Sequence, residues 1–222
     1  MNLSKKYDPT LFKNHPNYEK IQACQSLLEL KNILYADKNL EIAKKVKNLV
    51  FSDGDEKASL MIIGEAPGKN EDESGTPFCG KAGNLLNEFL AKVNFEREKN
   101  IYITNVVNWR PEDNRPPFDD EIEYCLPYLE KHIALKMPKM ILALGATSGK
   151  ALLMQKKIVL NDLRKKNIVY KNYFSRQEIP LIITFHPAYI VRRTDLKNDF
   201  LDDLKFMEQQ FRHVLKKVHE CV

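Results

Sequence analysis

The sequence predicts an α/β fold: a three-layer α/β/α sandwich with a central, mostly parallel, four-stranded sheet. Two observations lead to this fold class. Short, continuous apolar runs alternate along the chain with longer segments whose apolar residues recur at helical spacing. Strands that are apolar on both faces are typical of parallel sheets covered by helices on both sides. With 222 residues, of which 43% are hydrophobic, the chain is long enough to build one such core.

Four apolar runs form the predicted strands, and a polar or glycine-containing turn follows each of them. Their short length suits a buried strand better than a helix. The runs lie at residues 60–63, 101–104, 140–144 and 181–184.

Helical spacing of apolar residues marks the segments around these runs. Between the strands, helices are predicted to begin at Lys81, Asp119 and Thr147. Residues 196–218 predict a closing amphipathic helix. Its apolar face is formed by Leu201, Leu204, Met207, Phe211 and Leu215.

The domain organisation follows from what precedes the first of these strands. Residues 1–57 contain two segments of helical character, 18–36 and 39–50, which predict a helical extension packed on the sheet unit. No internal repeat or low-complexity linker interrupts the sequence. We therefore expect residues 1–222 to form a single domain.

Composition and charge exclude several classes of protein. No apolar run approaches the roughly 20 residues of a membrane-spanning helix, and the first ten residues lack the apolar core of a signal peptide. We therefore expect a soluble, cytoplasmic protein. The net charge of +5 is a mild excess. No C-x-x-C pair exists, so no local signature of a zinc or redox site is present. The cysteines are Cys24, Cys79, Cys125 and Cys221.

The turns after the strands carry the unusual polar residues. Gly64 begins GEAPG, Asn105 begins NVVNWRPEDNRPP, Gly145 begins GATSGK, and His186 begins HPAYIVRR. Ligands bind at the carboxyl ends of the strands in open α/β sheets. The first turn is not a phosphate loop, because its two glycines are too close and no Ser or Thr follows Lys69. These turns therefore predict a site of another kind, with a carboxylate beside the strand end.

In this order the motifs resemble the uracil-DNA glycosylase superfamily, and specifically its family 4. The motifs that carry the resemblance are GEAPGKNED, GTPFCGKAGNLL, ITNVV and HPA, within roughly residues 60–193. The resemblance implies a DNA repair enzyme that hydrolyses the N-glycosidic bond of uracil in DNA and leaves an abasic site. Such enzymes flip the nucleotide out of the stack into a pocket. It also implies uracil-containing DNA as the partner, and we expect a monomer.

Three residues are candidates for catalysis under this resemblance. His186 matches the histidine that contacts uracil O2, where an imidazole N–H stabilises the negative charge of the departing base. Asn105 matches the residue that reads uracil, donating to O4 and accepting from N3–H. Glu65 is a candidate for orienting water or offsetting positive charge on the sugar. Taken singly, His186 also fits a strand cap, and Asn105 fits a turn residue.

Three further residues are candidates for binding the base. Phe78 matches the aromatic residue that stacks on the flipped ring. Glu71 matches the position that walls the C5 side of uracil and disfavours the methyl group of thymine. Ala66 stands where the best-known branch of the superfamily has a water-orienting aspartate. Core packing is the alternative for Phe78, and a salt bridge to a lysine is the alternative for either glutamate, Glu65 or Glu71.

The segment after His186 resembles the loop that wedges into the minor groove. Ile190 or Val191 would fill the space left by the flipped base, and Arg192 and Arg193 would hold phosphates. Lys150 belongs to a basic run that fits either a polyanion contact or a solvated helix face. Lys156 and Lys157 lie in the same run.

The cysteines depart from the family 4 pattern, which holds a [4Fe–4S] cluster with four thiolates. Cys125 matches the fourth ligand, whereas Trp109 stands at the third position. The upstream region near residues 35–45 has no cysteine pair. Because one thiolate cannot hold such a cluster, we expect no iron–sulfur cluster and no metal site. Trp109 and the N-terminal helices are expected to fill the space.

More than one function stays open at this point. The motifs favour a monofunctional uracil-DNA glycosylase. A catalytically weak or inactive DNA-binding member of the same fold, or a glycosylase for other deaminated bases, would keep most of the same residues. A small-molecule nucleoside hydrolase would not need the IVRR segment after the histidine motif.

Overall fold

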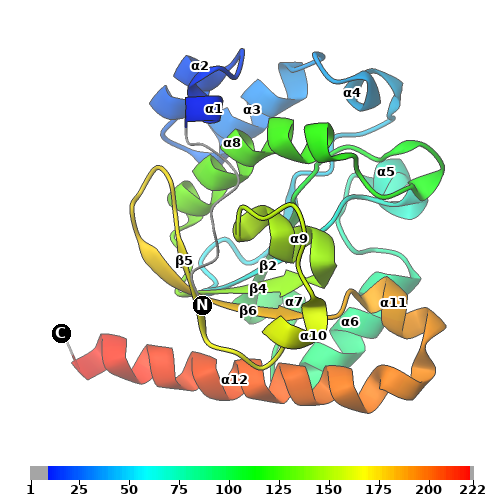
Figure 1. Cartoon of the computed structure of the whole chain (residues 1–222), viewed down its shortest axis with the longest axis vertical. Helices are drawn as coiled ribbons and strands as arrows, with labels where there is room; N and C mark the ends of the chain where they lie inside the picture. The colour runs from blue at the N-terminus through cyan, green and yellow to red at the C-terminus, as the bar shows by residue number, and fades with distance from the viewer. Residues whose placement is uncertain (1–9, 221–222) are drawn as a thin grey trace.

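The computed structural model describes residues 10–220. Residues 1–9 and Cys221 lie outside the described residues. The first of these stretches covers most of the ten residues whose sequence lacks the apolar core of a signal peptide. Figure 1 shows a central sheet between two layers of helices, with the long α12 (Lys197–Glu220) along one side and α8 (Asp119–Lys136) on the other. The predicted three-layer α/β fold is confirmed.

Within the described residues the sheet has six strands, in the order β1-β3-β2-β4-β6-β5. The inner strands β3, β2, β4 and β6 are mutually parallel and contain the predicted apolar runs. Two antiparallel strands close the edges, β1 beside β3 and β5 beside β6. The expected four-stranded sheet is therefore the parallel centre of a wider one. The bounds are β1 Ser52–Gly54, β2 Leu60–Gly64, β3 Ile101–Asn105, β4 Met140–Leu144, β5 Ile168–Lys171 and β6 Glu178–Thr184.

Side chains of the inner strands alternate between two apolar cores, one on each face of the sheet. On strand β2, Leu60 and Ile62 face the core beneath α6 (Lys81–Ala91) and α12, whereas Met61 and Ile63 face the core beneath α8. All four side chains are fully buried. This double burial explains why the strands read as continuous apolar runs.

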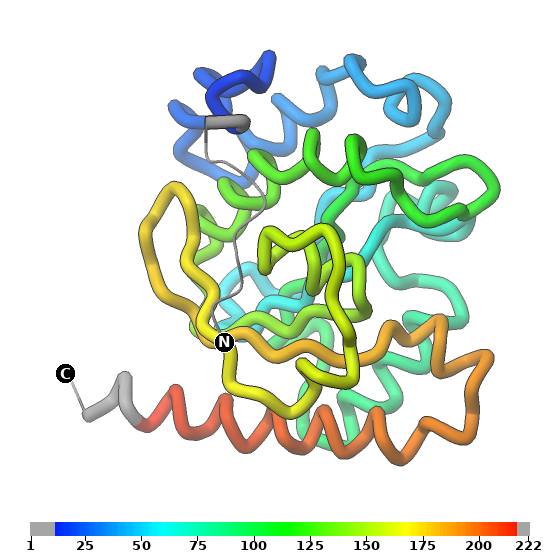
Figure 2. Tube along the Cα trace, viewed as in Figure 1, coloured from blue at the N-terminus to red at the C-terminus, as the bar shows by residue number. Residues whose placement is uncertain are grey.

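The N-terminal segments form short helices that pack on α8. The predicted helix over 18–36 is broken in two, because Ser26 caps a new helix and accepts a hydrogen bond from the Glu29 N–H. Figure 2 shows this N-terminal part, in blue, beside the green α8. The bounds are α1 Thr10–Lys13, α2 Tyr18–Ala23, α3 Leu27–Ala36 and α4 Glu41–Lys45.

The remaining helices follow the predicted order, with α9 beginning two residues before Thr147. On α12, Leu204, Met207 and Phe211 are buried as predicted, and Leu201 and Leu215 are partly buried. None of the helices in residues 10–220 is long and apolar enough to span a membrane. The bounds are α5 Lys69–Ser74, α7 Arg97–Asn100, η1 Glu112–Asn114, α9 Gly145–Leu152, α10 Leu160–Leu163, α11 Pro187–Arg192 and η2 Thr194–Leu196.

Candidate active site

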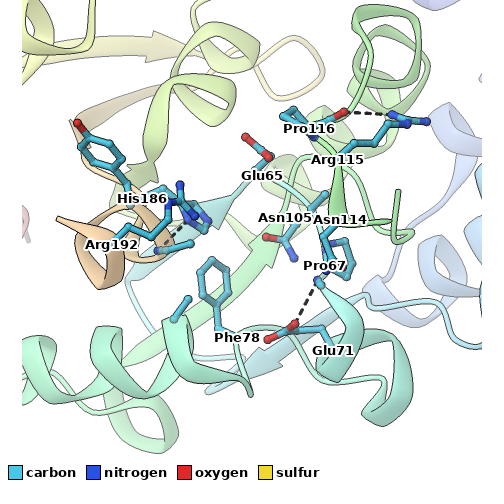
Figure 3. Close-up of a pocket in the computed structure, with 15 residues that line it drawn as sticks. Glu65, Pro67, Glu71, Phe78, Asn105, Asn114, Arg115, Pro116, His186 and Arg192 are labelled. Atoms are coloured by element: carbon cyan, nitrogen blue, oxygen red, sulfur yellow. Dashed lines mark hydrogen bonds between the residues drawn. The ribbon is translucent and has the colours of Figure 1, made fainter. Parts of the chain in front are cut away.

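The carboxyl ends of the parallel strands open into a cavity of about 480 Å³. Residues from the turns after β2, β3 and β6 line it, together with the turn before α6 (Figure 3). The structure thus brings together seven of the residues expected from the sequence. These are Glu65, Ala66, Glu71, Phe78, Asn105, His186 and Arg192.

Asn105 ends strand β3 at the floor of this cavity. Its side chain is 2% exposed, and its Oδ1 has no hydrogen-bond partner among the described residues. Gly64 leaves room for it, because a Cβ there would lie 2.4 Å from Asn105 Oδ1 and 2.4 Å from Phe78 Cζ. A buried acceptor without a partner costs about 1–3 kcal/mol. A ligand that donates a hydrogen bond to Oδ1 removes that cost.

His186 faces the cavity as a neutral hydrogen-bond donor. It caps α11, and its Nδ1 accepts a hydrogen bond from the Ala188 N–H at 3.2 Å. Although the ring reaches the cavity and is partly exposed, burial by the surrounding protein lowers its pKa to about 4. The charge of Arg192 lowers the pKa as well, and Glu71 opposes it. With Nδ1 accepting, the proton of the neutral ring sits on Nε2, the remaining nitrogen.

The two glutamates have different surroundings. Glu71 accepts from the Gly68 N–H at 3.1 Å and from the Gly80 N–H at 2.9 Å. It therefore ties the first turn to the turn that carries Phe78, in place of the salt bridge considered from the sequence. Glu65 accepts a hydrogen bond from the Thr147 hydroxyl at 2.5 Å. Figure 3 shows Glu65, Asn105, Phe78 and His186 around the same space.

Phe78 is both a wall of the cavity and part of the core on the α6 side of the sheet. It is 6% exposed, and its ring centroid lies 5.7 Å from that of His186. Its backbone has a φ of +53°, which is unusual for an aromatic residue. The two roles considered from the sequence, packing and lining a site, are thus compatible in one side chain.

A comparison with known protein families shows to which family the chain belongs. Residues 51–205 match the family described as the uracil DNA glycosylase superfamily. The chain belongs to this superfamily. The resemblance found in the motifs is therefore confirmed.

Curated relatives in the superfamily share most of the chain. It is 44% identical over 161 residues to the type-4 uracil-DNA glycosylase of Pyrobaculum aerophilum, covering 71% of this chain and 81% of the relative. The type-4 uracil-DNA glycosylase of Sulfurisphaera tokodaii is 36% identical, with 81% and 82% covered. That of Archaeoglobus fulgidus is 33% identical, with 82% and 91% covered.

The residues expected to contact DNA do not all face solvent. Ile190 is fully buried, because the segment after His186 is the helix α11 and this position packs against α6. Ile190 is therefore not available in this structure to wedge into DNA, which leaves Val191 of the two residues considered. Its neighbours Tyr189 and Val191 are 36% and 38% exposed. A loop was expected from the sequence at HPAYIVRR, whereas residues Pro187–Arg192 form a helix.

The basic residues near the cavity differ in their availability. Arg192 lines the cavity, whereas Arg193 pairs with Asp195 at 2.7 Å. Lys150 pairs with Asp119 at 2.7 Å and points toward the start of α8. Such exposed pairs are weak, contributing at most about 1 kcal/mol, so neither cation is firmly held by its carboxylate.

Several residues at the site were not among the candidates proposed from the sequence. Thr147 orients Glu65 from the first turn of α9. Asn114 and Arg115 form the wall opposite His186, and Arg115 is held by a two-pronged ion pair with Glu121 at 2.8 and 2.7 Å. The run RPEDNRPP, with its prolines and charges after a strand, was the signal in the sequence for this wall.

The described residues do not fit the iron–sulfur cluster of family 4. Cys125 is 1% exposed inside the apolar core, and burial raises the pKa of its thiol, which opposes the thiolate that a cluster needs. Trp109, at the third ligand position, is also buried in this core. Within residues 10–220, no group of three or more His, Cys, Asp or Glu side chains is placed to hold a metal.

A hydrogen-bonded cluster around Asp37 occupies the region between the N-terminal helices and α8. The buried carboxylate accepts from the hydroxyls of Tyr124 and Tyr128, both at 2.7 Å, and from Asn17 Nδ2 at 3.0 Å. It also accepts from the backbone and side chain of Asn39. Burial alone would raise the pKa of Asp37, but these hydrogen bonds outweigh it and lower the pKa. We call these residues the Asp37 cluster.

The absence of an iron–sulfur cluster stays a prediction, and it can be measured directly. We expect protein purified without air exposure to contain far less than stoichiometric iron and to lack the broad visible absorbance of iron–sulfur clusters. Elemental analysis and an absorption spectrum check this. Stoichiometric iron that Cys125→Ser removes would contradict it, and Cys24→Ser is the matched control.

Proposed function

We propose that this protein is a uracil-DNA glycosylase, which flips uracil out of DNA into the cavity and hydrolyses its N-glycosidic bond. The single observation that carries the proposal is the unpaired Oδ1 of Asn105 in the same cavity as the neutral His186. A buried acceptor and a fixed donor in one cavity suit a planar base that offers N–H and C=O groups. The curated names of the relatives support the same activity.

Asn105 supplies the discrimination between bases. Its Oδ1 accepts from uracil N3–H while its Nδ2 donates to O4. Cytosine presents a lone pair at N3 and an amino group at C4, so both contacts become repulsive. The ring of Phe78 stacks on the base, an interaction worth about 1–3 kcal/mol. Glu71, fixed by two backbone N–H groups, walls the side of the base where thymine carries a methyl group.

His186 and Glu65 act on the charges that develop during hydrolysis. The C1′–N1 bond breaks as water adds to C1′ and releases a proton to solvent, and the base leaves as an anion that then takes a proton from solvent. The Nε2–H of His186 donates to O2 and stabilises this anion without losing its proton. The Glu65 carboxylate, held by Thr147, offsets the positive charge on the sugar and orients the water.

DNA lies across the mouth of the cavity in this proposal. Arg192 contacts phosphates, Arg193 and Lys150 exchange their carboxylate partners for phosphates, and Val191 with Tyr189 enters the space left by the flipped base. We further propose that the enzyme acts as a monomer in the cytoplasm and that its N-terminal helices and sheet unit form a single domain. Light scattering at working concentration tests the oligomeric state.

A gel assay tests the proposal. The protein is incubated with oligonucleotides that carry one uracil, and alkali then cleaves abasic sites. Strand breaks with uracil, but not with cytosine or thymine in the same place, support the proposal. DNA binding without breaks would identify a binding module. Strand breaks with hypoxanthine but not with uracil would identify a glycosylase for another base. Release of uracil from free deoxyuridine would identify a nucleoside hydrolase.

The lowered pKa of His186 gives this reaction a characteristic pH dependence. The pKa of His186 is about 4 in the folded protein, against an ordinary value of 6.5. The contribution of this ring to the free energy of unfolding is therefore complete above pH 6.5 and is lost as the pH drops toward 4. We expect no loss of kcat/KM near pH 6.5 and an acid limb near pH 4. A pH–rate profile measures this. A limb near 6.5 that disappears in His186→Ala would contradict it.

A further inference from the structure

Arg97 lies behind the cavity wall and contacts the turn that carries Phe78. In α7, its Nη1 donates to the Pro77 carbonyl and its Nη2 to the Phe78 carbonyl, both at 2.8 Å. The same Nη1 donates to the Asp53 carboxylate on β1 at 2.9 Å. The Arg97 side chain is 15% exposed. One planar cation thus joins two consecutive carbonyls to the edge of the sheet.

The turn is strained and tightly enclosed at this point. An aromatic residue with φ near +53° persists where the surrounding structure over-determines its conformation. The Phe78 carbonyl also lies directly against α6, because a Cβ at Gly83 would be 1.7 Å from its oxygen. Gly83 and Arg97 together therefore fix the Phe78 carbonyl in space.

We propose that Arg97 is a positioning residue for base excision: it holds the Phe78 turn so that the ring stays in the stacking position for the flipped base. This inference rests on the proposed function of the cavity. The ring has little freedom at its other end, since its Cζ lies against Gly64. A shift of the turn would therefore tilt the ring toward Asn105 or His186 and narrow the place of the base.

The geometry requires arginine at this position. The guanidinium offers its N–H groups in a rigid plane, which matches two carbonyls and a carboxylate at once. Lysine keeps the positive charge but lacks this fork. Arg97→Lys is thus a conservative change in charge that removes the geometric role.

A double-mutant cycle tests the inference. We measure kcat/KM on a uracil oligonucleotide, and inhibition by free uracil, for Arg97→Lys, Phe78→Ala and the double variant. Arg97→Lys is expected to lower kcat/KM about 10- to 100-fold and to weaken uracil inhibition. In the Phe78→Ala background the same change is expected to have less than about a twofold effect. An equal loss in both backgrounds would overturn the inference, because Arg97 would then act through the fold as a whole.

Hydrogen–deuterium exchange of residues 74–82 reports on the turn without requiring activity. Exchange is expected to be faster in Arg97→Lys and unchanged in Tyr128→Phe, a variant in the distant Asp37 cluster that controls for a general loss of stability. Unchanged exchange in Arg97→Lys would overturn the inference. A wild-type protein that releases no uracil but shows this exchange pattern would refute the proposed function and leave the hold on the turn intact.

Asp53→Asn provides a second variant if Arg97→Lys does not fold. It weakens the anchor of the guanidinium while the contacts to both carbonyls remain available. We expect a several-fold loss of kcat/KM that again disappears in the Phe78→Ala background. A loss of the same size in both backgrounds would count against the inference here as well.

Discussion

Asn105→Ala is expected to lower kcat/KM for uracil release from DNA by about 100- to 1,000-fold, and His186→Ala by a similar factor. Alanine at position 105 removes the acceptor for N3–H and the donor to O4, so the base loses both contacts that select it. Alanine at position 186 removes the donor that stabilises the departing anion. The measurement is single-turnover kinetics on a uracil oligonucleotide, with thermal unfolding as a check on the fold.

Matched variants separate these losses from general effects. Asn198→Ala and His213→Ala remove the same side chains from exposed positions of α12 and are expected to leave kcat/KM unchanged. Affinity for an abasic-site oligonucleotide is expected to change little in Asn105→Ala, because that ligand has no base to read. Wild-type activity in either site variant would contradict the assigned roles.

Asp37→Ala is expected to lower the free energy of unfolding by about 3 kcal/mol, the largest change in stability that we expect from a single polar residue here. The substitution leaves the buried hydroxyls of Tyr124 and Tyr128 and the amide of Asn17 without their shared acceptor. Chemical denaturation measures the loss. Because the folded pKa of Asp37 is lowered, its stabilising effect is complete above its unfolded pKa and falls as the pH drops toward the folded value.

Single hydroxyl deletions refine this result. Tyr124→Phe and Tyr128→Phe are each expected to cost about 1 kcal/mol. Tyr35→Phe is the matched control, since Tyr35 is 66% exposed on α3. Equal effects of Tyr35→Phe and Tyr128→Phe would show that the Asp37 cluster does not stabilise the N-terminal helices.

The parallel centre of the fold was predictable because its strands are buried on both faces. The continuous apolar runs match β2, β3 and β4 to within one residue at each end. For β6 the run matches the end of the strand, but the strand begins three residues earlier. The edge strands gave no such signal: β1 reads SDG and has no apolar residue, and β5 exposes alternate side chains. Edge strands are defined by pairing with a neighbour, which a local reading of the sequence does not contain.

The candidate site was predictable where its residues belong to motifs. Asn105 and His186 lie at or just after strand ends and Phe78 belongs to the GTPFCGKAGNLL motif, and all three line one cavity. Thr147 and Arg97 were not foreseen, because each acts through a hydrogen bond to a residue far away in the sequence. The burial of Ile190 was not foreseen for a local reason: a proline at the first position of α11 starts a helix where a loop was expected.

The two short antiparallel strands at the sheet edges also bear on how the protein behaves at high concentration. An open parallel sheet would offer a long row of unpaired backbone groups to another molecule. Here the outermost strands have three residues in β1 and four in β5, and β5 is the outer arm of a hairpin with β6. Such short edges disfavour strand addition between molecules and so protect the apolar strands behind them from edge-to-edge aggregation.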